Sequence, residues 1–482
     1  MSPRADRWAV PLAVAACAGA ASLPGALGHA LYGDEVASAR ILGEPDLAGV
    51  LRHVRLTEST PPGWYVVAWL ARLAVGDVAS VRLLSVAFVA VAAALTAAWA
   101  RQLLRSQAAA ALAGSLVALG SEPVAYAEQI RAYALVVLLS VAFGMLLVEA
   151  AQRPRTRVLV GLSAVAWLGT LTHYFFFFVL AAGAVWPWAT RAPGARRTTV
   201  ALAIGLAGFL LWMPGLIHQH QHGRYRWIGG FDVNAVATLP GQLFFGPDGL
   251  LYGLARVALT LALVVGAVTL WWRRSEGTAV VALGLLPILG AGVVWVAGEP
   301  IFDQRNLLPV APFLAILVAA GVRELPPRVL PVAAIASVAV VLAGAAYAQA
   351  SLGRVAYDKA ARALTSFGWR FRDGLIVDYP TGVQITSAMA WYLPGRPELA
   401  WAPGFRRCRT RFAIVQTSSA ASWLARRDDV IASRELTYYD HPILGRPRGS
   451  ILVVRFRRPT HLRGAFFYVV GERSWGACRP SG

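Results

Sequence analysis

Charged residues are scarce in this sequence. Only 15% of the 482 residues are charged and 57% are hydrophobic, with a mean hydropathy of +0.55, whereas soluble domains carry about a quarter charged residues. Apolar runs recur along the chain, and many have the roughly 15–25 residues typical of membrane-spanning helices. This composition argues against an ordinary soluble protein and predicts a polytopic α-helical membrane protein.

Lysine is almost absent. Lys359 is the single lysine among 45 basic residues, and the net charge is +20. A strongly basic chain can indicate a nucleic-acid-binding protein, but here the arginines lie between the apolar runs. This placement is typical of loops that orient a membrane protein with its positive charge on the cytoplasmic side. We therefore expect that the arginines orient the protein in the bilayer and that it does not bind nucleic acid.

Cysteine and nucleotide-binding motifs are also missing. The three cysteines form no CxxC motif, which argues against zinc or dithiol redox chemistry. Because Walker, GxGxxG, GxSxG and HExxH motifs do not occur in a suitable context, we expect no nucleotide cofactor and no cytosolic nucleotide-sugar enzyme. The absence of a chain of acids within the apolar runs argues against a proton-coupled pump. A bridge between Cys408 and Cys478 requires that this part be exported.

About eleven apolar runs qualify as spans. They occupy residues 8–28, 80–100, 107–121, 133–150, 157–172, 174–190, 199–217, 250–272, 278–297, 306–321 and 328–348. The first run is long for a signal peptide and is followed by others, so we interpret it as an uncleaved span. Each run should be helical, because unpaired backbone groups are costly in hydrocarbon.

The run at 61–76 decides the orientation. If it is an interfacial helix opened by Pro61 and Pro62, the N-terminus and all arginine-rich loops lie in the cytoplasm. If it is a span, the order of the later basic loops is reversed, so we favour the interfacial helix. Residues 29–79, 122–132, 172–173, 218–249, 298–305 and everything after 348 then lie outside the cytoplasm.

The composition changes after residue 350, where arginine, aspartate and tyrosine increase. Short β-type runs occur at 374–380, 411–417, 451–457 and 465–470, and residues 421–432 have a helical pattern. We therefore predict a transmembrane catalytic domain at 1–348, with an extracytoplasmic loop at 29–79, and a small extracytoplasmic α/β domain at 349–482.

Asp34 and Glu35 follow the first span directly. Acids close to a span are costly and therefore functional candidates. A carboxylate here could take the proton from an attacking hydroxyl or amine, two could hold a divalent metal, or both could be ordinary solvated loop acids. Glu58 precedes the proline pair, where it could stabilise the start of the interfacial helix or be a second acid over the same cavity.

A second polar group lies at 121–135, "SEPVAYAEQIRAYAL". Glu122, Glu128, Arg131 and Tyr133 there lie at the mouth of a span. Glu128 and Arg131 are three residues apart and could simply pair with each other. Alternatively, Arg131 could bind a phosphate, whose geometry suits a guanidinium group.

His173 and Tyr174 stand between two apolar runs. The histidine could be a packed hydrogen-bonding residue or could contact a phosphate or an acceptor. At 298–313, Gln304 and Arg305 follow Asp303 directly before a span. Arg305 could be an interfacial anchor or could neutralise a phosphate leaving group.

The stretch "HQHQHGRYRWIGGFD" at 218–232 contains three histidines at alternate positions. This spacing is a weak signal for a metal, because helical metal pairs favour a separation of four residues. Arg224 and Arg226, next to Trp227, could clamp an anionic head group, or the segment could be an ordinary polar loop.

The order of these motifs resembles the GT-C glycosyltransferases, in particular the protein O-mannosyltransferase and aminoarabinose transferase superfamily. The resemblance covers residues 1–350 and rests on the acidic pair, "TPPGWYVV", Glu128 to Tyr133, "THY" and "RNLLP". It implies a membrane-bound glycosyltransferase of class EC 2.4 with a polyprenyl-phosphate sugar donor and an inverting transfer at the extracytoplasmic face of a bacterial plasma membrane. Thr60 stands where many relatives have histidine, and whether a divalent metal takes part stays open.

The resemblance also implies roles for individual residues. Asp34 corresponds to the catalytic base, with Glu35 beside it. Arg131, Arg305, Arg224 and Arg226 are expected at the donor phosphate, and a further group is expected to bind substrate, namely Glu58, Glu128, Tyr133, His173, Tyr174 and Gln304. The acceptor is a glycan, lipid or protein of the cell envelope. The alternatives are a flippase for a lipid-linked glycan, which needs no base, and a scaffold whose C-terminal domain recognises a partner.

Overall fold

The computed structural model describes most of the chain. The described residues are 6–223, 241–245, 250–273, 276–299, 301–326, 328–329, 332, 339, 342, 357–370, 373–378, 388–393, 395, 399–402, 409–416, 418–439, 447–462 and 466–471. Contacts divide the chain into two compact units, one of residues 1–27 and 41–348 and the other of residues 28–40 and 349–482. The segment after the first helix thus groups with the C-terminal residues.

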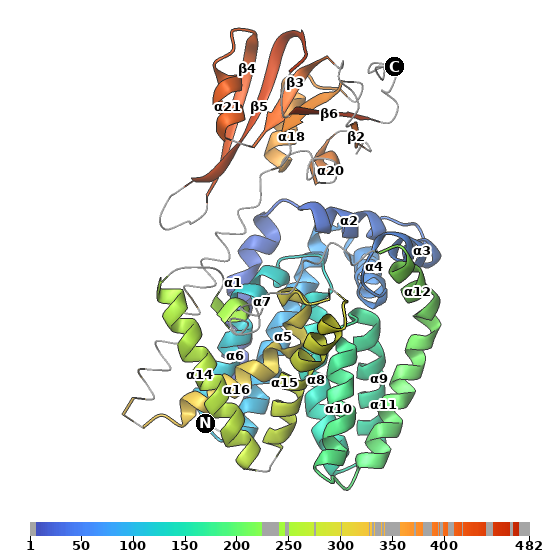
Figure 1. The fold of residues 1–482 in the computed structure, drawn as a ribbon, viewed down its shortest axis with the longest axis vertical. Coiled ribbons are helices and arrows are strands. Elements are labelled where there is room, and N and C mark those ends of the chain that lie inside the picture. Colours follow the sequence, from blue (N-terminus) through green and yellow to red (C-terminus); the bar gives the residue numbers. More distant parts are fainter. Residues whose placement is uncertain are drawn as a thin grey trace. The chain divides into compact units, whose positions relative to one another are not determined.

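The first unit is a bundle of helices (Figure 1). Its α-helices are α1 (Asp6–Gly28), α3 (Leu47–Thr57), α4 (Gly63–Val75), α5 (Arg82–Leu104), α6 (Gln107–Leu119), α7 (Ser121–Ala127), α8 (Tyr133–Gln152), α9 (Thr156–Thr172), α10 (Phe176–Ala189), α11 (Ala195–Phe209), α12 (Met213–Gln221), α14 (Leu250–Trp272), α15 (Gly277–Val296) and α16 (Ala311–Arg323). Three short 3-10 helices, η1 (Ala79–Val81), η2 (Leu210–Trp212) and η3 (Gln304–Val310), precede α5, α12 and α16. α2 (Gly33–Leu42) crosses the boundary between the two units.

Seven of the described helical segments are long and apolar enough to cross a bilayer. The bent pair α6–α7 would make eight, and α4, α9 and α10 are shorter apolar helices. The structure therefore confirms a polytopic helical protein but not the predicted number of eleven spans. Most of the predicted span 328–348 lies outside the described residues.

Local chemistry explains several helix boundaries. Asp46 begins α3 by accepting a hydrogen bond from the Gly49 N–H at 2.6 Å, and Ser106 begins α6 by accepting one from the Ala109 N–H at 3.2 Å. Gly120 has an extended backbone and separates α6 from α7, which are bent by 51°. The predicted span 107–121 therefore ends at this break, and part of the predicted loop 122–132 is helical.

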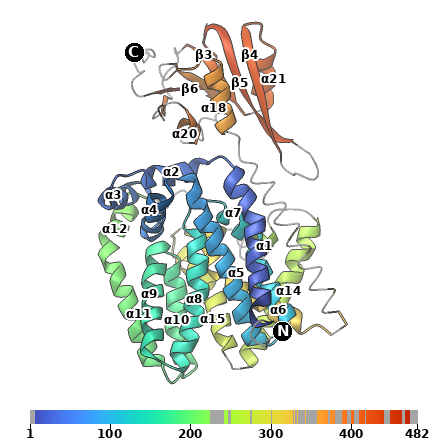
Figure 2. The same ribbon diagram turned by 180° about the vertical axis from the view of Figure 1, so that it is seen from behind.

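Figures 1 and 2 show α3, α4 and α12 at one end of the bundle, at the ends of the longer helices. α4 buries Trp64, Tyr65 and Ala68, while Leu70 and Leu73 are exposed. This two-sided helix is compatible with the predicted interfacial position of 61–76. α16 is buried along its whole apolar sequence and forms the centre of the bundle.

The second unit contains a six-stranded sheet in the order β2-β6-β1-β3-β5-β4. Its strands are β1 (Leu375–Asp378), β2 (Leu399–Ala402), β3 (Thr410–Val415), β4 (Val430–Tyr439), β5 (Pro447–Thr460) and β6 (Phe466–Gly471). Its described α-helices besides α2 are α18 (Tyr357–Ser366), α20 (Ala390–Tyr392) and α21 (Ser418–Ala425). Only β1 and β3 pair in parallel among the described strands. The prediction of a small α/β fold is confirmed.

One predicted element of this unit differs. The helix expected at 421–432 ends at Ala425, and β4 begins at Val430. The Arg427 guanidinium forms an ion pair of 2.8 Å with Asp429 in the turn between them, and this pair lowers the pKa of the Asp429 carboxyl. Cys408 and Cys478, and with them the question of a disulfide, lie outside the described residues.

Candidate active site

Glu58, Tyr65 and Arg131 meet inside the helical unit. The Arg131 Nη1 atom lies 3.4 Å from the Glu58 Oε2 atom and 3.4 Å from the Tyr65 hydroxyl oxygen. Glu58 follows α3, Tyr65 belongs to the first turns of α4, and Arg131 lies in the link from α7 to α8. Both charged side chains are buried, with exposed fractions of 10% for Arg131 and 7% for Glu58.

The two prolines before α4 help to position Glu58 and Tyr65 beside Arg131. Pro61 and Pro62 come three and four residues after Glu58 and directly precede α4, which begins at Gly63. The Gly63 Cα faces the backbone of Leu171, because a Cβ there would lie 2.6 Å from the Leu171 carbonyl oxygen. The "PPGWY" segment therefore fixes Glu58 and Tyr65 together against the end of α9.

Glu128 is fully buried at the end of α7. Its carboxylate lies against the backbone of α1, since a Cβ added at Gly25 would lie 2.0 Å from the Glu128 Oε2 atom. No side chain other than hydrogen fits at Gly25 unless Glu128 moves. The sequence gives no signal for this contact, because a glycine within an apolar run is common in membrane helices.

Aromatic rings connect this region with the turn between α9 and α10. The Tyr126 and Tyr133 ring centroids are 4.2 Å apart, and those of Tyr133 and His173 are 5.4 Å apart. The Phe175 N–H donates to the His173 Nδ1 atom at 3.2 Å, so the proton of the neutral ring is on Nε2. The Nε2 atom is buried and has no hydrogen-bond partner among the described residues.

Two arginines act on His173. Burial, together with the positive charges of Arg131 and Arg305, lowers the pKa of His173 to about 3. His173 is therefore neutral at pH 7. It presents an N–H donor that carries no charge, close to two guanidinium groups.

Arg305 begins the buried η3–α16 segment. Its backbone N–H donates to the Asp303 Oδ1 atom at 3.0 Å, and its Nε atom lies 3.3 Å from the same oxygen. Glu122 interacts electrostatically with both Asp303 and Arg305. Gln304 begins η3, but its side chain lies outside the described residues.

A hydrogen-bond network holds the proline segment from the other side. The Tyr174 hydroxyl donates to the Gln219 Oε1 atom at 2.6 Å, and the Trp212 Nε1–H donates to the Tyr174 hydroxyl at 3.0 Å. The Gln219 Nε2 group donates to the Val54 carbonyl at 3.1 Å and the Thr60 carbonyl at 3.2 Å. Gln219 thus links Tyr174 to the backbone on both sides of Glu58. The sequence pattern did not indicate Gln219, because the histidines beside it are the more distinctive residues.

A cavity of about 330 Å³ lies beside this network. Its lining is mostly apolar, with a few polar groups from α12 and the end of α15, and comprises Ser59, Tyr174, Leu216, Gln219, His220, Val294, Glu299 and Ile301. Ser59, one of the lining residues, follows Glu58 directly in the chain. A pocket of this kind suits a ligand with an apolar body and a few hydrogen-bonding groups.

The other predicted site residues belong to the second unit or lie outside the described residues. Asp34 and Glu35 form the first turn of α2 and belong to the second unit. Glu35 is fully buried and accepts a hydrogen bond from the Tyr32 N–H at 3.5 Å, while Asp34 is half-buried. Arg224 and Arg226 lie outside the described residues.

The histidines of the 218–232 stretch belong to α12 and the turn after it, where the prediction placed a loop. His218 and His222 are four residues apart, and their ring centroids are 4.0 Å apart. The His222 Nδ1 atom is 2.7 Å from the His218 carbonyl oxygen. Among the residues that the structure describes, no group of three or more His, Cys, Asp or Glu side chains could hold a metal ion.

Comparisons with known proteins identify the fold. No family model and no curated protein sequence matches the chain. The crystal structure of ArnT from Cupriavidus metallidurans in the apo state matches with a TM-score of 0.56 and 13% identity, over 92% of this chain and 97% of ArnT. ArnT from the same organism bound to undecaprenyl phosphate matches over the same shares with a TM-score of 0.54 and 13% identity.

The archaeal oligosaccharyltransferase AglB from Archaeoglobus fulgidus, in complex with an inhibitory peptide and a dolichol-phosphate, has a TM-score of 0.42 and 12% identity. The match covers 70% of this chain and 56% of AglB. The ArnT matches extend over nearly the whole of both chains and so include the helical unit and the C-terminal sheet. The chain therefore has the fold of ArnT.

Proposed function

We propose that this protein is a membrane glycosyltransferase that takes a sugar from a polyprenyl-phosphate donor and transfers it to an acceptor of the cell envelope. The observation that carries the proposal is the buried Arg131, which lies 3.4 Å from Glu58 and from Tyr65 inside a bundle of apolar helices, with Arg305 at the start of the buried η3–α16 segment. A polyprenyl phosphate is an anion whose tail remains in the bilayer, so it needs cations at the ends of membrane helices. The ArnT fold is consistent with this donor, because one ArnT structure contains undecaprenyl phosphate.

The arginines would stabilise the leaving group. When the bond between the sugar C1 atom and the phosphate oxygen breaks, its electrons remain on the phosphate and raise its negative charge. Guanidinium groups fixed in a buried site stabilise such developing charge strongly. Glu58 and Tyr65 hold Arg131 at 3.4 Å and thereby orient it before the donor binds.

His173 and Tyr133 would form one wall for the donor. The Nε2–H group of His173 is neutral and could donate a hydrogen bond to a phosphate or sugar oxygen. It has no hydrogen-bond partner among the described residues. The Tyr133 ring, 5.4 Å from His173, offers an apolar face for a sugar ring. Glu128 would support this wall through its fixed position against α1.

Asp34 would act as the general base. An acceptor hydroxyl or amine attacks the sugar C1 atom from the side opposite the phosphate, and its proton passes to the Asp34 carboxylate, with inversion at C1. Glu35 would stabilise the start of α2 and thereby the position of Asp34. The cavity between Ser59, Tyr174 and Glu299 would take the acceptor.

We place the protein in a bacterial plasma membrane with the N-terminus in the cytoplasm and the second unit outside it. The arginine-rich loops support this orientation. Mannose and arabinose are both suitable sugars for such a donor.

Turnover with a panel of polyprenyl-phosphate sugars tests the proposal. The full-length protein in liposomes should release polyprenyl phosphate from at least one donor, and Asp34→Asn should abolish the release. Asp46→Asn is the matched control, because Asp46 caps α3 and has no proposed chemistry. Movement of the lipid across the bilayer that persists in Asp34→Asn, with no release from any donor, would instead indicate a flippase.

A further inference from the structure

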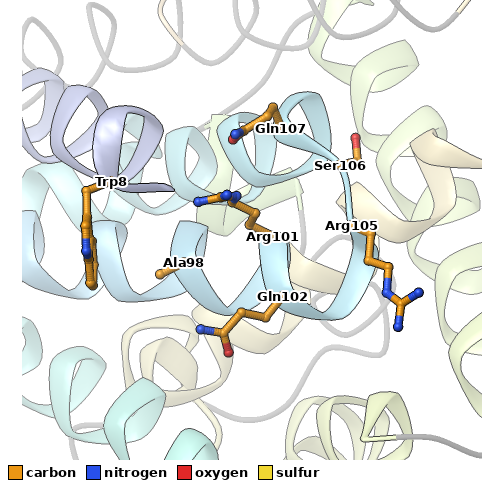
Figure 3. Close-up of a pocket in the computed structure, with 7 residues that line it drawn as sticks. All are labelled: Trp8, Ala98, Arg101, Gln102, Arg105, Ser106 and Gln107. Atoms are coloured by element: carbon orange, nitrogen blue, oxygen red, sulfur yellow. The ribbon is translucent and has the colours of Figure 1, made fainter. Parts of the chain in front are cut away.

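A second cavity, with a more polar lining, lies at the opposite end of the helical unit. It has a volume of about 580 Å³ and lies between the beginning of α1, the end of α5 and the beginning of α6 (Figure 3). It is lined by Trp8, Ala98, Arg101, Gln102, Arg105, Ser106 and Gln107. Nothing in the proposed transfer uses these residues.

The distance between this cavity and the candidate active site follows from the number of residues between them along α1 and along α5. Gly25 of α1 contacts Glu128, and Trp8 precedes it by 17 positions, which correspond to about 26 Å of helix. On α5, the Ser85 hydroxyl donates to the Gln129 carbonyl at 2.7 Å, and Arg101 lies 16 positions further along, or about 24 Å. The hydrocarbon core of a bilayer is about 30 Å thick. This cavity and the part of the candidate active site around Glu128 and Gln129 therefore lie near opposite surfaces of the membrane.

The charge of this cavity is positive. Its lining includes two guanidinium groups and no acid. Neither Arg101 nor Arg105 forms an ion pair with any residue that the structure describes. Figure 3 shows the Arg101 side chain beside that of Gln107 and directed to the side of Trp8, whereas Arg105 points away from Arg101.

The turn between α5 and α6 adds to the positive electrostatic potential of the cavity. Arg105 has a φ of 50°, in the left-handed region, and its N–H donates to the Arg101 carbonyl at 2.9 Å to end α5. Ser106 then begins α6, so the positive end of a 13-residue helix lies at the cavity. Ser106, Gln102 and Gln107 provide neutral hydrogen-bonding groups around the same space.

Trp8 identifies the environment of the cavity. It is 44% exposed at the start of a candidate span, where tryptophan is typical of the boundary between hydrocarbon and head groups. Leu12, one turn further along α1, is 64% exposed and so faces the hydrocarbon. A ligand in this cavity would have its polar part beside Arg101 and its apolar part beside α1.

We propose that this cavity binds the phosphate head group of an anionic phospholipid from the membrane leaflet opposite the candidate active site. Basic pockets between membrane helices at this depth are known to suit such head groups. The phosphate would accept hydrogen bonds from Arg101 and Gln107 at the start of α6, Arg105 would contact the head group from the rim, and the acyl chains would lie along Trp8 and Leu12. This site is independent of the proposed transfer.

Lipid binding to the full-length protein in a neutral detergent tests this site. The probe is dioctanoyl phosphatidylglycerol, with dioctanoyl phosphatidylcholine and inorganic phosphate as separate arms, and the readouts are lipid-bound species in native mass spectrometry and the shift in Tm. We expect phosphatidylglycerol to bind and to raise Tm, and the double variant Arg101→Gln/Arg105→Gln to bind it at least roughly tenfold more weakly.

Arg196→Gln/Arg197→Gln is the matched control. It removes two exposed arginines at the beginning of α11, outside the cavity, and should bind the lipid like the unaltered protein. Gln107→Glu is a second test if the double variant folds poorly, because it adds an acid to the cavity in the first turn of α6, where an acid favours the helix. Equal binding by all variants would overturn the proposal, as would equal binding of phosphatidylcholine or an equal effect of inorganic phosphate.

Discussion

At the scale of single residues, variants of the buried pair of Glu58 and Arg131 can distinguish its contribution to stability from its contribution to sugar transfer. Arg131→Gln leaves the buried Glu58 carboxylate without its partner at 3.4 Å, and removal of one member of a buried ion pair costs of the order of 3 kcal/mol. We expect a lower Tm and loss of sugar transfer. The double variant Glu58→Gln/Arg131→Gln should recover most of the Tm but none of the activity, because it restores neutrality and not the phosphate contact.

The control for this pair is Arg273→Gln, which breaks the exposed ion pair of 2.8 Å between Arg273 and Glu324. Exposed pairs contribute little, roughly 0–1 kcal/mol, so Tm and activity should hardly change. Full transfer activity in the Glu58→Gln/Arg131→Gln protein would contradict the role of Arg131 at the donor phosphate.

His173 predicts a dependence of stability on pH. Its pKa is lowered to about 3 in the folded protein, from an ordinary value of 6.5, so the unfolded chain binds more protons between these values. Stability should therefore fall as the pH decreases from about 6.5 towards 3, by about 2–3 kcal/mol at pH 4.5 from this residue. His173→Phe should show a smaller fall in Tm between pH 7 and 4.5, and the exposed His222→Phe should behave like the unaltered protein. An unchanged pH profile in His173→Phe would mean that the buried ring does not titrate as described.

At the scale of elements, close packing of α1 against Glu128 predicts an asymmetry between two glycines. Gly25→Ala places a Cβ 2.0 Å from the Glu128 Oε2 atom, and overpacking of this kind costs typically 1–3 kcal/mol. Gly19→Ala on the same helix meets nothing within 4 Å and should be neutral or slightly stabilising. Thermal unfolding in detergent measures both. Gly25→Ala combined with Glu128→Ala should regain stability, and the absence of this recovery would show that the strain lies elsewhere.

The helices and strands also show which features of the fold can be predicted from the sequence. The apolar runs predicted the long helices because hydrocarbon admits little else, but Gly120 breaks one run and the turn at Asp429 shortens another predicted helix. The motifs around Glu58, Arg131 and His173 predicted important positions, but not that Arg131 lies beside a residue 73 positions earlier. The contacts of Gly25 and Gln219 depend on tertiary packing between distant segments, for which one sequence carries no signal.

At the scale of the whole molecule, the grouping of residues 28–40 with the C-terminal unit gives that unit a part in the proposed reaction. The Leu31 N–H donates to the Tyr392 hydroxyl, and Leu31 precedes Asp34 by three positions. The C-terminal unit thus holds the segment that contains the proposed base. This arrangement differs from the predicted organisation, in which the loop 29–79 belonged wholly to the transmembrane domain.

Tyr392→Phe tests this link without removing a domain. The variant loses one hydroxyl, so the start of α2 loses a hydrogen bond while the fold of the sheet remains. We expect a lower kcat with an unchanged KM for the donor, because Asp34 would be less well positioned while the donor phosphate would still meet Arg131 and Arg305. Tyr357→Phe is the matched control, since its hydroxyl accepts a hydrogen bond from the Gln416 side chain at 3.3 Å within the same unit. Equal kcat values in both variants would indicate that the C-terminal unit does not position the base, and a raised KM in Tyr392→Phe alone would assign the segment 28–40 to donor binding instead.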